Sequence, residues 1–162
     1  MPIHEDLDAL LASPHAHQVF KRVRDRIFEH RALKGPFAAY EHRLTPGERI
    51  VLLVNAFVWD VDNGGMNQVL GNSTGDHAEE LRGHLRALGA LEAAQALDEI
   101  SRRIYAGGPI PVDSDERRKR LFAWEELDEA AAEDFFDSLV FETEDILTAT
   151  ADYIRANRNM FD

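Results

Sequence analysis

Residues 50–59 constrain the fold more than any other part of the sequence, because this segment, IVLLVNAFVW, is apolar on nearly every side. Just before it, Thr45 can cap a helix, Pro46 suits the first helical position, and Glu48 can bond back to the cap. A buried strand would also accept such a run, but its length and its start signal favour a helix. We therefore expect a central buried helix.

The remaining periodic segments also predict helices, and no segment carries a convincing hairpin signal. Further helices are expected over residues 4–12, 15–33, 66–71, 76–88, 90–105 and 115–123, and two more over the last 38 residues, with a break near 141–143. The sequence thus predicts an all-α fold, a compact single domain of about eight or nine helices over residues 1–162.

Charge is distributed very unevenly along this chain. The whole sequence holds 18 Lys and Arg against 30 Asp and Glu, a net charge of −12, and residues 121–162 alone hold two bases against twelve acids, which gives −10. Such an excess repels nucleic acid and anionic membranes and attracts basic partners. No apolar run reaches the ~18–20 residues needed to cross a bilayer. We expect a cytoplasmic protein that binds neither nucleic acid nor membrane directly.

Two amphipathic helices are expected to display these acids. At about 100° per residue, one continuous helix would place its acids opposite Trp124, Leu127, Ala131, Phe135 and Leu139, and the last helix would do the same opposite Ile146 and Leu147. Their linear density, roughly one charge per 4 Å, is close to the phosphate spacing of a DNA strand. An ordinary acidic surface is the alternative. The acids that would contact a partner are Glu125, Glu126, Glu129, Glu133, Asp137, Glu144, Asp145 and Asp152.

Candidate catalytic and metal-binding groups are few. His77, Glu80 and His84 recur at helical spacing, but the two imidazoles would stand nearly 10 Å apart, too far to chelate one ion easily. Asp60 and Asp62 could act as an acid–base pair, and more simply they are polar residues at a helix end. We expect no catalytic residue, no bound metal and no cofactor, hence a protein that is not an enzyme.

Two Asn/Gly turns interrupt the helices after residue 61. Glycines there permit unusual backbone angles, and Asn, Ser or Asp can cap the helix that follows. Asn63, Gln68 and Asn72 could also tie the two turns together, or line a small-molecule pocket with Trp59. We interpret the set as structural; its members are Asn63, Gly64, Gly65, Gln68, Asn72, Ser73, Gly75 and Asp76.

These turns carry a resemblance to a known family. The stretch Asp62-Asn63-Gly64-Gly65-Met66-Asn67-Gln68, followed by Asn72-Ser73-Thr74-Gly75-Asp76-His77-Ala78 and by Leu88-Gly89-Ala90, resembles the signature of a bacterial DNA-mimic protein family, the DMP-nineteen-like domain. The similarity covers roughly residues 45–158, so that residues 1–44 would be an N-terminal helical extension. Met66, Val69 and Leu70 stand where the family pattern would have aromatics.

The resemblance implies an all-helical homodimer whose acidic surface imitates duplex DNA and occupies a basic DNA-binding protein, such as a helix-turn-helix regulator. It assigns no catalytic residue, and the signature residues build the fold rather than the acidic contacts. Two other hypotheses stay open. One is an immunity or antitoxin-like inhibitor of a basic nuclease; the other is a small-ligand-binding domain built on the two Asn/Gly turns.

Overall fold

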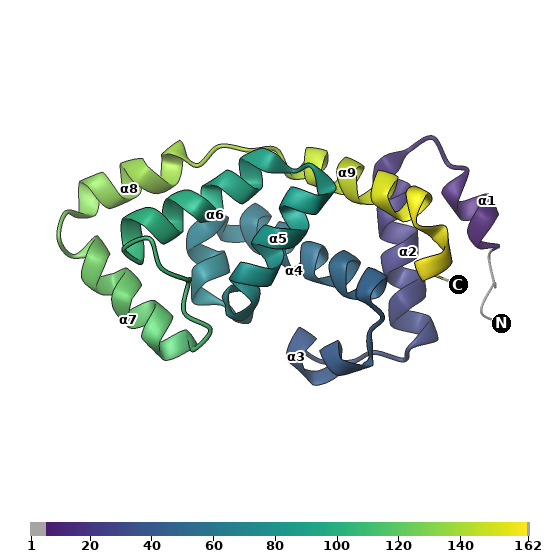
Figure 1. Ribbon diagram of the computed structural model, residues 1–162, viewed down its shortest axis with the longest axis horizontal. Helices are drawn as coiled ribbons and strands as arrows, with labels where there is room; N and C mark the ends of the chain where they lie inside the picture. The colour runs from purple at the N-terminus through teal and green to yellow at the C-terminus, as the bar shows by residue number, and fades with distance from the viewer. Residues whose placement is uncertain (1–5, 162) are drawn as a thin grey trace. The chain divides into compact units, whose positions relative to one another are not determined.

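The computed structural model describes residues 6–161, and this part of the chain is built from helices with no β-strand (Figure 1). The prediction of an all-α fold is confirmed. Three short 3₁₀ segments accompany the α-helices: η1 (Glu41–Arg43), η2 (Ser73–His77) and η3 (Arg158–Met160). The α-helices are α1 (Leu7–Leu11), α2 (Ala16–His30), α3 (Phe37–Tyr40), α4 (Pro46–Gly71), α5 (Ala78–Leu88), α6 (Leu91–Ile104), α7 (Ser114–Glu125), α8 (Glu129–Ser138) and α9 (Thr143–Ala156).

Contacts within the chain define two compact units. The first unit comprises the residues up to Asn55 and those from Glu144 on, and the second comprises Ala56–Thr143. The chain passes from the first unit to the second within α4 and returns at the start of α9. The organisation of residues 1–162 as a single domain, with a family-like core over 45–158 and an extension over 1–44, stays a prediction.

Helix α4 begins as the sequence indicates. The Glu48 carboxylate accepts a hydrogen bond from the Thr45 N–H at 2.8 Å, and the Glu48 N–H donates to the Thr45 hydroxyl at 3.3 Å. This reciprocal pair is a capping box, which satisfies donors that a helix start leaves open. Val51, Val54 and Phe57 are fully buried, as expected for a central helix.

Burial of α4 is nevertheless not complete around its circumference. Trp59 is 68% exposed, so the expectation of an apolar segment buried on every side is wrong at this residue. The helix is also kinked, because Gly64 and Gly65 have non-helical backbone angles. The expected short helix over 66–71 is therefore the last part of α4, beyond the kink.

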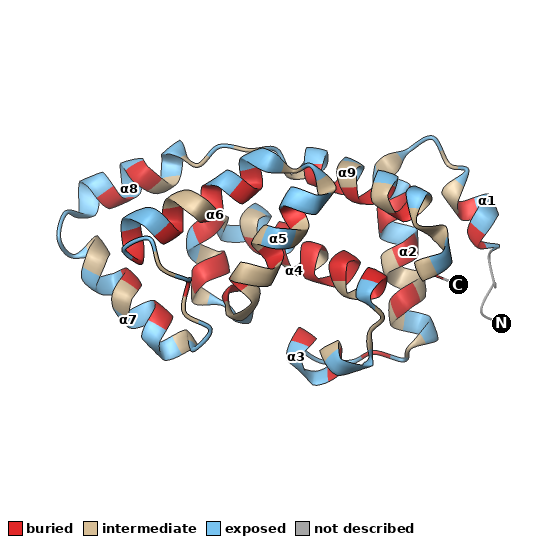
Figure 2. Cartoon of the chain, in the orientation of Figure 1, coloured by how far each residue is buried: buried red, intermediate tan, exposed pale blue. Residues whose placement is uncertain are grey.

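In the second unit, α5 and α6 pack as an antiparallel pair around the tight turn at Gly89, which has a φ of +80°. That left-handed conformation at a helix end suits glycine. Leu81 and Leu85 of α5, and Leu97 and Ile100 of α6, are fully buried. Figure 2 shows buried bands along both helices, and these four side chains supply much of this unit's core.

In the first unit, the C-terminal segment is fastened to the N-terminal helices. The Arg155 guanidinium donates to the Leu11 carbonyl at 3.3 Å and to the Ser13 carbonyl at 2.7 Å, and Arg158 pairs with Asp8.

Residue 4, where the first helix was expected to begin, lies outside the described residues. The segment that holds α3 and η1 was not expected to be helical.

The largest error in the predicted elements concerns residues 124–140. One continuous helix was expected there, but α7 ends at Glu125 and α8 begins at Glu129. The Asp128 carboxylate accepts a hydrogen bond from the Ala131 N–H at 3.1 Å and so caps a new helix. Aspartate caps compete with helix continuation, and Leu127, which was expected on the apolar face of that helix, is 82% exposed in the turn.

Candidate functional site

A concave surface in the second unit collects most of the acids that the sequence singled out. It encloses about 550 Å³, a volume typical of binding pockets, between the α4 kink, the end of α7 and helix α8. We call it the acidic groove. Its lining residues are Gly64, Gly65, Met66, Asn67, Phe122, Glu125, Glu126, Glu129, Ala132, Glu133, Phe136 and Asp137.

The α4 kink opens one wall of the acidic groove. Gly65 has a φ of +67° and a ψ of −164°, a conformation that is essentially restricted to glycine. A Cβ atom built on Gly65 would meet no atom within 4 Å, so backbone rather than a side chain faces the open space there. Beyond the kink, Met66 is buried and contributes apolar surface to the groove.

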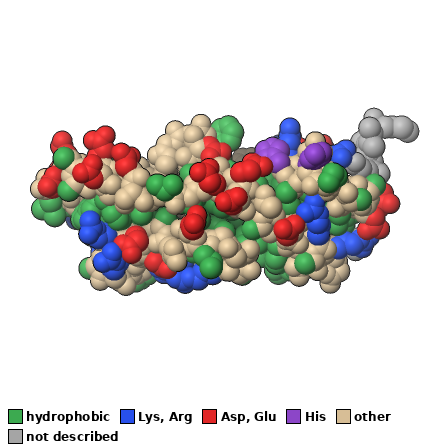
Figure 3. All heavy atoms as spheres, turned by 90° about the horizontal axis from the view of Figure 1, so that it is seen from above, with side chains coloured by type: hydrophobic (Ala, Val, Ile, Leu, Met, Phe, Trp, Pro, Cys, Tyr) green, Lys and Arg blue, Asp and Glu red, His purple; other side chains and the backbone are tan. Residues whose placement is uncertain are grey.

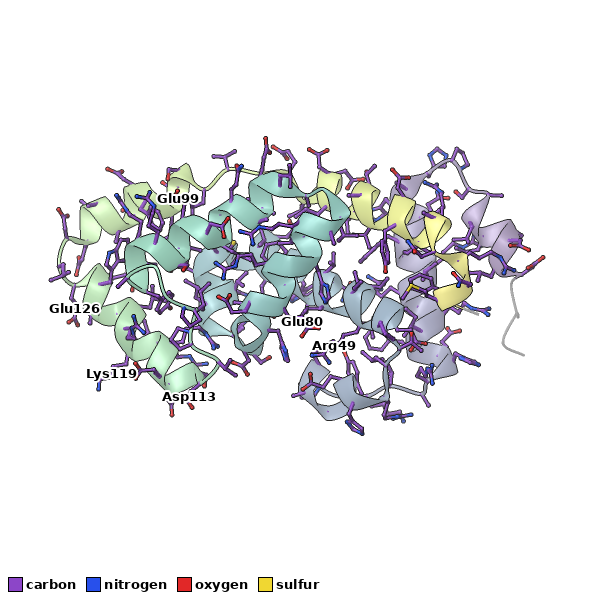
Figure 4. All side chains as sticks on the ribbon, in the orientation of Figure 1. Arg49, Glu80, Glu99, Asp113, Lys119 and Glu126 are labelled. Atoms are coloured by element: carbon purple, nitrogen blue, oxygen red, sulfur yellow. The ribbon has the colours of Figure 1, made fainter. Side chains whose placement is uncertain are left out.

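The turn between α7 and α8 brings acids from two helices around the same space. Asp113 and Glu126, both labelled in Figure 4, mark the two ends of α7. Since the chain turns at residues 126–128, Glu125 and Glu126 line the groove together with Glu129 and Glu133 of α8. The predicted set of five acids is thus grouped by a turn, although a single helical face was the predicted reason.

Aromatic rings hold α7 and α8 against each other. The Trp124 ring lies edge-on to Phe135 at 5.4 Å and to Phe136 at 6.1 Å, and the Phe135 and Phe136 centroids are 5.4 Å apart. Such contacts add to the burial of apolar area. Phe136 also lines the acidic groove.

No basic side chain lines the acidic groove. Within residues 6–161, none of its five carboxylates pairs with a Lys, Arg or His side chain, and Figure 3 shows acidic side chains crowding the end of the second unit where α8 lies. Glu125 is the least exposed of the five, and burial raises the pKa of its carboxyl above the ordinary value. The groove therefore presents five carboxylates that form no direct ion pair with a basic side chain of the described residues.

The three remaining predicted acids lie on α9, in the first unit. Glu144 stands 3.7 Å from the His17 imidazole, and Asp152 forms an ion pair with Arg155 at 2.8 Å. Asp145 is exposed in the first turn of that helix. The eight predicted contact residues therefore fall into two groups that belong to different units.

The second Asn/Gly turn surrounds a residue that the sequence analysis missed. Arg117 is fully buried, and its five guanidinium N–H groups all find acceptors. They donate to the Leu70, Pro111, Val112 and Asn72 carbonyls and to Asp76 Oδ1, at 2.7–3.0 Å. A signal was present in the sequence, since Arg117 lies four residues before the buried Leu121 on the inner face of α7.

Gly75 belongs to the same arrangement. A Cβ atom there would stand 2.5 Å from Arg117 Nε and 2.7 Å from the Val69 carbonyl oxygen, so only glycine lets the arginine approach. Asn72 and Asp76 accept from the guanidinium through a backbone and a side-chain oxygen respectively. These contacts fasten the start of α7, and hence one wall of the acidic groove, to the end of α4.

The sequence suggested that side-chain amides tie the two turns together, but the amides of Asn63 and Asn72 bond elsewhere. The Asn63 amide donates to the Trp59 carbonyl at 2.7 Å, and the Asn72 amide donates to Asp60 Oδ1 at 2.8 Å. Asn63, Asn72 and Trp59 are absent from the lining of the acidic groove, whereas Gly64 and Gly65 belong to it. The acidic groove is thus a different site from the ligand pocket suggested for Asn63, Asn72 and Trp59, which stays a prediction.

The other candidate groups identified in the sequence make separate local contacts. His84 Nε2 lies 3.1 Å from Glu80, and His77 Nδ1 lies 3.8 Å from it, yet in the described chain no three His, Asp or Glu side chains converge to hold a metal ion. Asp60 is buried against Asn72, while Asp62 accepts from the Thr143 hydroxyl at 2.9 Å. The two aspartates therefore serve separate contacts.

Together these features define an all-α protein with an unneutralised acidic groove. The chain belongs to the DMP19-like protein family, whose pattern it matches over residues 42–157. The suspected family relationship is confirmed, and the matched residues include the α4 kink, the Arg117 site and both acid-bearing groups. Searches of curated proteins and of solved structures found no match. No helix within residues 6–161 is long and apolar enough to cross a membrane.

Proposed function

We propose that this chain is a non-enzymatic DNA mimic that occupies the DNA-binding surface of a basic protein, such as a helix-turn-helix regulator, in the cytoplasm. The observation that carries the proposal is the acidic groove, whose lining within residues 6–161 holds five carboxylates and no Lys, Arg or His side chain. Membership of the DMP19-like family supports the same conclusion.

Charge complementarity explains how such a surface would select its partner. A protein that binds DNA presents Lys and Arg side chains at spacings that match phosphates. The acids at the end of α7 and on α8 could meet those side chains, while the net charge of −12 repels DNA itself. Association driven in this way is fast, selective for basic surfaces, and weakened by salt.

The α9 acids would contribute less to this surface. Glu144 and Asp152 already have basic neighbours in His17 and Arg155, so a partner's cation would have to compete with them. Homodimerisation, which the family resemblance implies, could add a second acidic groove to the same complex. Sedimentation of the purified protein would show whether it is a dimer.

The experiment that tests the proposal captures partners from a lysate of the source cells on the immobilised protein. We expect a DNA-binding protein that is released by moderate salt and displaced by duplex DNA. The variant Glu126→Gln/Glu129→Gln/Glu133→Gln/Asp137→Asn should lose it. A matched control, Glu29→Gln/Glu92→Gln/Asp115→Asn/Glu116→Gln, removes the same charge at exposed positions outside the groove and should retain it.

Two results would overturn the proposal. If both quadruple variants bound the partner equally, net charge rather than the acidic groove would be responsible. If the captured protein were a nuclease whose active site is blocked, the chain would be an immunity-type inhibitor. Circular dichroism of each variant must match the wild type, because the comparison has meaning only for folded proteins.

A further inference from the structure

The acidic groove is more than a row of charges. Its floor is apolar, since Met66 is 4% exposed and Ala132 is 5% exposed. Phe122 and Phe136 form aromatic walls, and Phe122 remains 56% exposed although it is a large apolar side chain. Exposed rings in a hollow usually mark a binding surface. A plain imitation of phosphates would need the carboxylates alone.

We propose that the acidic groove receives an arginine side chain from a basic segment of the protein partner, an inference that rests on the proposed function and specifies its central contact. A guanidinium is planar, stacks on aromatic faces and binds carboxylates with two parallel hydrogen bonds. Its methylene stem can lie on apolar surface. The groove offers these three kinds of contact through its rings, its carboxylates and its apolar floor.

The same unit already holds arginines in this manner. The Arg103 guanidinium lies over the Phe135 ring at 5.2 Å from its centroid, and Arg120 lies over Tyr105 at 5.1 Å. In the groove, the Phe136 ring is held in place by Trp124 and Phe135 but has no guanidinium over it in the described chain. A lysine would satisfy the carboxylates, but its compact ammonium stacks less well on a ring.

The backbone at the α4 kink completes the fit. Open space lies beside Gly65, where any side chain would intrude on the groove. The volume of about 550 Å³ also exceeds what one guanidinium needs, which leaves room for neighbouring residues of the same segment. The occupant is therefore an arginine within a peptide segment, rather than a free small cation.

The test uses defined peptides in place of the unknown partner. Acetylated hexa-arginine and hexalysine amides, which carry equal charge, are titrated into the protein at two salt concentrations. The background is Trp59→Phe, since Trp59 is exposed and Trp124, the only other tryptophan, lies beside Phe136. Trp124 fluorescence then reports on the groove, and calorimetry gives the affinities.

We expect hexa-arginine to bind about five- to tenfold more tightly than hexalysine, the advantage expected from cation–π stacking. Phe122→Leu, which keeps an apolar side chain but removes the ring, should reduce this ratio to below about twofold. Leu91→Ala is the matched control, because Leu91 is also 56% exposed, lies in the same unit and is outside the groove. It should leave the ratio unchanged.

Equal binding of the two peptides, or a ratio that Phe122→Leu does not alter, would overturn the arginine assignment. The proposed function would survive either result, provided that the DNA-binding partner is still captured and still lost with the groove acids. Capture of no DNA-binding protein at all, together with a preserved preference for hexa-arginine, would instead contradict the mimic while keeping the arginine site.

Discussion

Helices α8 and α9 each carry several of the acids near the C-terminus, yet they present very different surfaces. On α9, two of the three predicted contact residues have basic neighbours, His17 for Glu144 and Arg155 for Asp152. Around α8, none of the groove carboxylates has one among the described residues. The number of acids in a segment therefore does not by itself determine the electrostatic potential around it. The basic side chains that the fold places beside those acids also decide it.

The difference between the two helices follows from where the fold places the Lys and Arg side chains. Residues 17–49 hold eight bases against four acids, and they fold in the same unit as α9. In the second unit most arginines have other tasks: Arg82 and Arg86 pair with Asp98, Arg102 pairs with Glu99, and Arg117 is buried. Arg103 and Arg120 lie over the rings of Phe135 and Tyr105, and none of these arginines lines the acidic groove.

The largest effect should come from Arg117→Met, which removes a buried guanidinium from the second unit. Five hydrogen-bond acceptors, among them the Asp76 carboxylate, would lose their donor, at a cost of about 3–5 kcal/mol of unfolding free energy. Arg118→Met is the control, because Arg118 is exposed and, within residues 6–161, its guanidinium donates to the Gly71 carbonyl alone. Urea unfolding of both variants measures the difference; a loss below about 1 kcal/mol for Arg117→Met would contradict the role assigned to it.

Replacing three carboxylates by amides on each helix compares the contributions of α8 and α9 to partner binding directly. Glu129→Gln/Glu133→Gln/Asp137→Asn on α8 should weaken binding to the captured partner about a hundredfold, since each carboxylate is available to a cation. Glu144→Gln/Asp145→Asn/Asp152→Asn on α9 removes the same charge and should weaken it by about threefold or less. Surface plasmon resonance gives both affinities, and equal losses would abolish the distinction between the two helices.

In the first unit, the capping box at the start of α4 offers a corresponding stability test. Glu48 is buried, accepts from the Thr45 N–H, and pairs with Arg31 at 2.9 Å. Glu48→Ala should lower the unfolding free energy by about 2 kcal/mol, because two charge-assisted bonds are lost. The control Glu92→Ala, at an exposed position in the first turn of α6, should lower the unfolding free energy by only about a few tenths of a kcal/mol. Chemical denaturation distinguishes them, and similar losses would refute the capping role.

The smallest expected effect is a difference in pH dependence between Glu125 and Asp8. Burial raises the pKa of Glu125 in the folded protein, so the folded state holds that proton more tightly and stability falls as pH rises through this range. Glu125→Gln should therefore be more stable than the wild type at neutral pH, with a gap that closes in acid. Denaturation at several pH values between 3 and 7 measures the gap.

Asp8 should behave in the opposite sense. Its hydrogen bond with Arg158 lowers the pKa of the carboxyl, so the stabilisation is present above the ordinary value and is lost as pH falls through the folded pKa. Asp8→Asn should be less stable than the wild type at neutral pH and should approach it in acid. The unfolding free energies of Asp8→Asn and Glu125→Gln, each relative to the wild type, should change with pH in opposite directions. A change in the same direction would contradict the causes assigned to the two pKa shifts.

Local signals predicted the helices well where they were strong. The capping box at Thr45 and Glu48, the stop at Gly89 and the Asp113 cap of α7 all act within four residues of the helix end they define. The turn at residues 126–128 was missed, since Asp128 was counted among the acids rather than recognised as a cap. The five groove acids nevertheless line one groove, because a tight turn keeps near neighbours in sequence close in space.

The sequence by itself determined the helical class, the family and the concentration of acid near the C-terminus, because periodicity, caps and composition are local properties. Only the tertiary structure decided which acids remain unneutralised, that Arg117 is buried in the second Asn/Gly turn, and that Phe122 and Phe136 share a groove with the carboxylates. Those features depend on residues such as Leu70 and Arg117, 47 positions apart, meeting in the fold. No local pattern encodes such a meeting, since it is selected by packing and hydrogen bonding across the whole unit.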